Sequence, residues 1–142
     1  MTAARPAPEV SLFRLYLLRA MYLLIAVGAG IHTWPAIVHH AKPWDLWHGV
    51  SMSFLGALTA LCLLGVRYPL RMLPLLLYEF AWKLLWVLAA WLPLWLAHRV
   101  DLATADNFFP IFLGVVIVPI VIPWGYVWRN YVTGPGDRWR RA

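Results

Sequence analysis

Glu79 and Lys83 are an acid and a base that lie four residues apart in a long apolar stretch, residues 70–96. About 20 mostly apolar residues are enough for a helix to cross a bilayer. On a helix, residues with this spacing are neighbours, and an acid that precedes the base gives the favourable pair. A Lys, Arg or Asp at the centre of a membrane helix costs roughly 2.5–3.5 kcal/mol on insertion scales. We therefore predict that the two charges pair and face the interior of the protein.

Two tryptophans, Trp82 and Trp86, flank these charges. Aromatic walls with a few converging polar groups are the usual composition of a ligand pocket. Two interpretations stay open: a structural ion pair that fixes helix packing, or a pair that handles a proton or a ligand in a cavity. In the second case the predicted ligand site comprises Glu79, Trp82, Lys83 and Trp86, with His32 and His48 as its outer rim.

The histidines offer a different kind of site, because histidine is the commonest metal ligand. The candidate metal ligands are His39, His40, His48 and Asp45. Their spacing matches no zinc pattern, so an interfacial polar rim is the alternative interpretation. Haem ligation by His32 and His48 is disfavoured, because His32 lies roughly 9 Å inside its apolar stretch whereas His48 lies near the start of the next one.

Composition excludes an ordinary soluble domain, because 63% of the 142 residues are hydrophobic and only 13% are charged. The length fits one domain, residues 1–142. The single cysteine, Cys62, excludes a disulfide framework or a Cys-based metal motif within one chain. The formal net charge of +6 comes mostly from residues that flank the apolar stretches, so it indicates membrane orientation and not nucleic-acid binding.

Four apolar stretches predict the fold class. They run over about 12–38, 46–66, 70–97 and 108–128. We predict an all-α integral membrane four-helix bundle in up-down-up-down order, with the tails 1–11 and 129–142 loose.

Glycines and prolines refine this prediction. Two pairs of small residues in the second stretch, Gly49 with Ser53 and Gly56 with Ala60, indicate close approach of another helix. Pro110 fits the start of the fourth helix. Two later prolines, Pro119 and Pro123, are expected to bend its second half.

The basic residues predict orientation, because Lys and Arg gather on the cytoplasmic side of membrane proteins. Nine of the twelve fall on one predicted side: Arg5, Arg14, Arg19, Arg67, Arg71, Arg129, Arg138, Arg140 and Arg141. Both termini are therefore predicted to be cytoplasmic. All five histidines then fall on the outer side.

Several segments resemble the DoxX-like group of small four-helix bacterial membrane proteins. The likeness lies in the first stretch, LLRAMYLLIAVGAGIH, and in SFLGALTALCLLGV followed by Arg-Tyr-Pro. The segment RYPLRMLPLLLYEFAWK is similar to that of uncharacterised proteobacterial membrane proteins. The resemblance covers about the first two thirds of the chain and implies a bacterial inner-membrane location. It also implies an association with membrane redox complexes and quinone-linked oxidation.

Three functions follow as hypotheses. The first is a binding or accessory protein that holds an apolar ligand, a lipid, a quinone or a partner helix in the Trp-lined bundle, as a homo-oligomer or within a larger membrane complex. The second is a small oligomeric proton-linked transporter in which Glu79 carries the proton. The third is a metal-dependent membrane enzyme that uses the outer histidines. No nucleophile–base pair or phosphate-binding loop indicates a catalytic residue.

Overall fold

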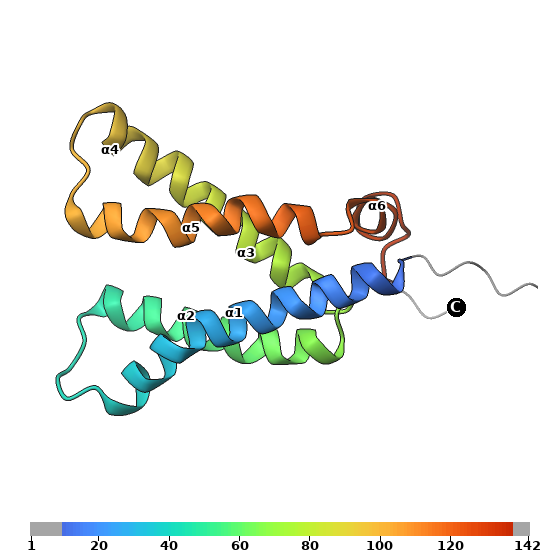
Figure 1. The fold of residues 1–142 in the computed structure, drawn as a ribbon, viewed down its shortest axis with the longest axis horizontal. Coiled ribbons are helices and arrows are strands. Elements are labelled where there is room, and N and C mark those ends of the chain that lie inside the picture. Colours follow the sequence, from blue (N-terminus) through green and yellow to red (C-terminus); the bar gives the residue numbers. More distant parts are fainter. Residues whose placement is uncertain (1–9, 138–142) are drawn as a thin grey trace, which may run out of the picture.

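The computed structural model describes residues 10–137, and this part of the chain is helical without strands (Figure 1). Its apolar helices are α1 (Leu12–His39), α2 (Leu46–Arg67), a continuous run from Leu73 to Leu96, and α5 (Leu102–Val121). Each of these four is long and apolar enough to cross a membrane. The first three agree closely with the predicted stretches. The predicted loose segments 1–9 and 138–142 lie outside the described residues.

Short polar side chains cap the first turns of α1 and α2. The Ser11 hydroxyl accepts a hydrogen bond from a backbone N–H in the first turn of α1. The Asp45 carboxylate does the same for two N–H groups of α2, both at 3.0 Å. The first N–H groups of a helix have no partner within the helix, and these caps satisfy them.

The third apolar run is not a uniform helix. It consists of α3 (Leu73–Trp86), a π-helical turn, η1 (Val87–Trp91), and α4 (Leu92–Leu96). In the turn, the Leu92 N–H donates to the carbonyl five residues earlier. Pro93 follows directly, and it has no N–H to donate. A π-helical turn shifts the backbone hydrogen bonds from four to five residues apart, which lets the helix continue past a proline.

The fourth apolar helix begins earlier than the predicted stretch 108–128. Asp101 caps α5, because its carboxylate accepts from the Thr104 N–H at 2.6 Å. Residues 102–107, which lie before the predicted stretch, therefore form the first turns of the helix. Pro110 lies inside α5 and not at its start, so this prediction was wrong.

The same helix ends at Val121, which is earlier than predicted, because of Pro123. Proline restricts the preceding residue to extended backbone, and Ile122 has φ −62° and ψ 127°. Pro123 also lacks the N–H that would bind the Pro119 carbonyl. The indole N–H of Trp124 donates to that carbonyl instead, at 2.8 Å. Pro123 thus terminates the helix that it was expected to bend.

Arg14 of α1 binds the last carbonyls of α5. Its Nη1 donates to the Ile120 oxygen at 2.7 Å and lies 3.4 Å from the Val121 oxygen. The last carbonyls of a helix have no donor within it, so the guanidinium satisfies two of them. These bonds join the first and last of the four apolar helices.

Two short elements complete the described chain. They are α6 (Trp124–Val127) and η2 (Trp128–Val132). Figure 1 shows α6 turned away from the axis of α5. Residues 129–132 are therefore helical, and the prediction of a loose tail is wrong for them.

The hairpin of α1 and α2 is tightly packed. The Tyr22 ring lies directly on Gly65, where a Cβ atom would overlap it. A Cβ at Gly56 would lie 2.8 Å from the Ile37 side chain, so the predicted close approach at Gly56 is confirmed. Gly49 differs, because its nearest neighbour is Trp44 of the preceding loop, at 3.8 Å.

The hydrophobic core occupies one end of the molecule. The two hairpins, α1–α2 and the third run with α5, meet where α2 joins α3 and diverge toward the loops at the other end (Figure 1). The buried core side chains include Leu18, Tyr22, Cys62, Leu73, Leu76, Val118 and Ile122. Tyr22 is fully buried, and its hydroxyl donates to the Pro69 carbonyl at 2.9 Å. This bond fixes α1 to the α2–α3 connection.

Candidate functional site

The predicted ion pair forms on α3. Lys83 Nζ lies 2.6 Å from a Glu79 carboxylate oxygen, and the exposed fractions of the two side chains are 15% and 3%. Both side chains therefore face the interior of the protein. Pairing within one helix lets the two groups share the desolvation cost that either would bear alone.

Gly114 of α5 makes room for Lys83. A Cβ at this glycine would lie 2.5 Å from the Lys83 Nζ and 2.7 Å from its Cδ. Gly114 is buried, so the lysine side chain passes directly over the α5 backbone. Sequence reasoning missed this residue. The available signal was a single glycine inside the run of large apolar residues from Ile111 to Val118.

Trp82 completes the polar cluster. Its indole N–H donates to the second Glu79 carboxylate oxygen at 2.5 Å. Each oxygen of Glu79 thus has its own donor, one from Trp82 and one from Lys83. Over the described residues, no buried side-chain nitrogen or oxygen lacks a hydrogen-bond partner. A fully satisfied network of this kind is rigid and holds its members in one geometry.

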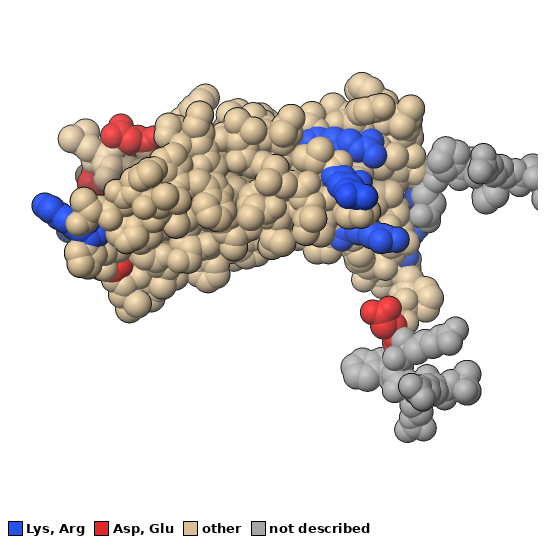
Figure 2. All heavy atoms as spheres, turned by 90° about the horizontal axis from the view of Figure 1, so that it is seen from below, with Lys and Arg blue, Asp and Glu red and all other residues tan. Residues whose placement is uncertain are grey.

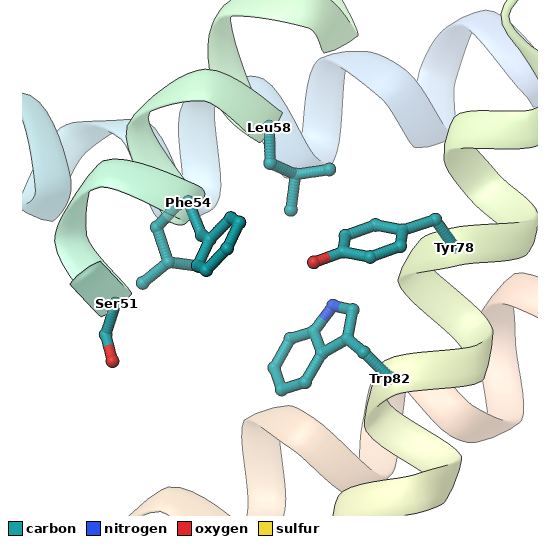
Figure 3. A pocket seen from close by; sticks show the side chains of 6 residues that line it. Ser51, Phe54, Leu58, Tyr78 and Trp82 are labelled. Atoms are coloured by element: carbon teal, nitrogen blue, oxygen red, sulfur yellow. The ribbon is translucent and has the colours of Figure 1, made fainter. Parts of the chain in front are cut away.

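A pocket lies beside this cluster, between α2 and α3 (Figure 3). Its volume is about 230 Å³. It is lined by Ser51, Phe54, Leu55, Leu58, Tyr78 and Trp82. The lining is mostly apolar, and Trp82 belongs both to this wall and to the Glu79 cluster. The buried carboxylate is therefore one hydrogen bond away from the pocket.

Tyr78 gives the pocket a polar group. Its hydroxyl points across the pocket toward α2 in Figure 3. This hydroxyl forms no hydrogen bond with any other described residue. A phenol can donate to a ligand oxygen or accept from a ligand hydroxyl. The pocket thus combines an apolar wall with one free donor and acceptor.

Sequence reasoning found only part of this pocket. Tyr78 lies four residues before Trp82, so the two share a face of α3, and this spacing was an available signal. On α2, residues 51, 55 and 58 also share one helical face. Periodicity does not reveal which faces of two helices meet, so the α2 wall could not be paired with α3.

The other predicted ligand residues lie elsewhere. Trp86 is half-buried one turn beyond Trp82 and does not line the pocket. His32 and His48 are both exposed, and neither belongs to the pocket or the ion pair. The predicted outer rim is therefore not assembled around the pocket. His32 and its neighbour Ile31 both lie on the exposed side of α1.

The candidate metal ligands serve other contacts. Asp45 caps α2, and His40 Nδ1 lies 2.8 Å from the Ile37 carbonyl oxygen. The His40 ring stacks on Trp44 with centroids 4.4 Å apart, and His48 meets the same indole edge-on. Across residues 10–137, no three His, Cys, Asp or Glu side chains come together as metal ligands. The four predicted ligands, His39, His40, Asp45 and His48, therefore do not form a metal site among the described residues.

The chain was also compared with known proteins. No family model, no curated protein and no solved structure matches it. A buried, satisfied carboxylate adjoins an apolar pocket, and the two share one tryptophan.

Proposed function

We propose that this chain is a small integral membrane binding protein that holds an apolar ligand in the pocket between α2 and α3. A quinone or a lipid is the ligand class that this pocket suits. The proposal includes an up-down-up-down four-helix bundle in a bacterial inner membrane, with both termini cytoplasmic. The observation that carries it is the double role of Trp82, which forms the pocket wall and donates to Glu79.

The lining supports a ligand that is apolar but carries an oxygen. Phe54, Leu58 and Trp82 supply the apolar contacts, and the Tyr78 hydroxyl supplies one hydrogen bond. A pocket of about 230 Å³ is smaller than the roughly 300–1,000 Å³ of drug-sized sites, so it fits one ring or the end of a chain. A quinone ring with its carbonyl oxygen meets both requirements. The resemblance to DoxX-like proteins favours the same class.

Ligand binding would be coupled to the charge on α3 through Trp82. A ligand that shifts the indole would lengthen its bond to Glu79 and leave one carboxylate oxygen without a donor. A buried acceptor without a donor costs free energy, so ligand binding and the charged pair on α3 would influence each other.

Filling the pocket tests the proposal. The full chain is purified with its lipids, and native mass spectrometry identifies retained ligand. The change Ser51→Trp places a large ring in the pocket, whereas Ser53→Trp adds the same ring on α2 outside it. Both serines are exposed and bond to the carbonyl four residues earlier, so the two variants are matched.

We expect the wild type and Ser53→Trp to retain the same small molecule and Ser51→Trp to lose it. Equal retention by all three proteins would contradict a site in this pocket. A wild type that retains nothing, and whose tryptophan fluorescence does not respond to added ubiquinone, would contradict the binding function itself.

The two rival functions are distinguished by other measurements. A proton-linked transporter would acidify or alkalinise liposomes that contain the purified protein, and loss of that flux in Glu79→Gln would support it. A metal enzyme has less support, because its candidate ligands do not converge within the described part of the chain.

A further inference from the structure

Three arginines surround a second pocket at the end of the molecule where α2 joins α3. The pocket measures about 340 Å³. It is lined by Leu15, Arg19, Arg67, Tyr68, Pro69, Leu70 and Arg71. Figure 2 shows basic side chains gathered toward this end of the molecule. The proposed apolar-ligand site shares no residue with it.

The arginine side chains are held in place by their neighbours. Arg67 and Arg71 both lie over the ring of Tyr68, with guanidinium carbons 5.4 Å and 5.8 Å from its centroid. Arg19 Nε donates to the Val66 carbonyl at 3.2 Å, which leaves its two terminal nitrogens available. Cation–π contacts and a backbone bond thus orient all three groups toward one space.

The backbone beneath these arginines is also fixed. The Tyr68 N–H donates to the Leu64 carbonyl at 2.8 Å, and the Met72 N–H donates to the Tyr68 carbonyl at 3.1 Å. The Pro69 carbonyl accepts from the buried Tyr22 hydroxyl. A preformed site loses little conformational freedom when a ligand binds.

The pocket is positively charged, and no acid among residues 10–137 forms an ion pair with its arginines. Throughout the described residues, the ion pair of Glu79 with Lys83 is the only one. Three guanidinium groups around one space repel each other, and an anion between them relieves that repulsion. Arginine presents paired N–H donors that match phosphate oxygens.

We propose that this pocket binds the phosphate-bearing headgroup of an anionic membrane lipid. Arg67 is the last residue of α2, so the pocket lies at the end of an apolar helix. Leu15 and Leu70 line it, and the exposed Leu64 lies one turn earlier on α2. A lipid can therefore place its phosphate among the arginines while its chain follows the apolar surface. Basic pockets at this depth are typical of anionic lipid sites.

Thermal stability of the purified full chain in detergent tests this site. The additives are short-chain phosphatidylglycerol, short-chain phosphatidylcholine and inorganic phosphate, at equal concentrations. Arg67→Gln with Arg71→Gln removes two charges from the pocket. Arg67→Lys with Arg71→Lys keeps the charge, and with it the membrane orientation, but removes the paired donors. Arg129→Gln is the control, because Arg129 is exposed and outside the pocket.

We expect phosphatidylglycerol to raise the melting temperature of the wild type and of Arg129→Gln more than phosphatidylcholine does. That difference should fall at least twofold in the lysine variant and disappear in the glutamine variant. An equal response in all variants would show that the lipid acts without this pocket, and the proposal would be overturned. An equal response to inorganic phosphate would overturn the lipid as the ligand.

Discussion

At the residue scale, Glu79 is the group whose role most needs a test. It is buried, and both of its oxygens are bound on α3. Its helix position and its partner Lys83 could be predicted from four-residue spacing. The bond from Trp82 and the glycine that accommodates Lys83 could not, because they depend on side-chain rotation and on a helix that lies far away in the chain.

Replacing the charges singly and together separates a structural pair from a functional one. Glu79→Gln leaves Lys83 without its counter-charge and should cost about 3–5 kcal/mol of stability. The double change Glu79→Leu with Lys83→Met removes both desolvation costs and should be close to neutral. Melting temperature in detergent measures both effects.

Ligand retention in the same double variant then decides the role. We expect the double variant to fold and to lose the ligand, because Trp82 has lost its acceptor. Full retention by a stable double variant would reduce Glu79 and Lys83 to packing residues.

Gly114 gives a second prediction at this scale. In Gly114→Ala, the added methyl group would occupy the place of Lys83 Nζ and Cδ. We expect the lysine to be displaced from Glu79 and stability to fall by about 1–3 kcal/mol, the usual cost of overpacking. Gly28→Ala is the control, because nothing lies within 4 Å of a Cβ there. Equal melting temperatures for the two variants would mean that Lys83 moves without cost.

At the scale of elements, the residues at the helix ends determined how accurately each helix could be predicted. The first three apolar helices are bounded by polar residues or tight connections, and their predicted limits hold within a few residues. The fourth failed because Asp101 caps a first turn that is polar in composition. Hydropathy alone assigns such a turn to a loop. The π-helical turn before Pro93 could not be predicted either, since it depends on how backbone bonds rearrange around a proline.

Asp101 makes the stability of α5 dependent on pH. The Thr104 N–H, and then the Thr104 side chain, donate to this carboxylate and lower the pKa of Asp101 below its ordinary value. The carboxylate therefore stabilises the folded chain above its unfolded pKa, and this contribution is lost as pH falls through the folded pKa.

Asp101→Asn keeps a capping oxygen but removes the titrating group. We expect the melting temperature of the wild type to fall more than that of Asp101→Asn between neutral pH and about pH 3. Parallel curves for the two proteins would show that the cap contributes nothing through its charge.

At the scale of the whole molecule, the structure is closely packed at one end and open at the other. The core around Tyr22 joins both hairpins, and the proposed ligand pocket lies between α2 and α3. The sequence predicted an all-helical chain and one residue of this pocket, Trp82. It did not predict the divergence of the hairpins, because small residues indicate close contact only within a pair such as α1 and α2.

The distribution of arginines predicts the orientation of the whole chain. Reporters fused to the C-terminus and inserted in the loop after Leu96 test it. We expect cytoplasmic signal from the first and periplasmic signal from the second, because the predicted topology puts nine of the twelve basic residues on the side of the termini. The opposite pattern would place the three-arginine pocket on the outer surface, away from cytoplasmic anionic lipid.

The bond from Arg14 to the end of α5 also sets an order of events during synthesis. Its two residues are 106 positions apart. At about 5–20 residues per second, the ribosome makes the acceptor roughly 5–20 s after the donor. During that interval the Arg14 guanidinium must bind water or lipid phosphate instead. The end of α5 displaces those partners when it arrives, so closure of the molecule has to wait until Ile120 has been made.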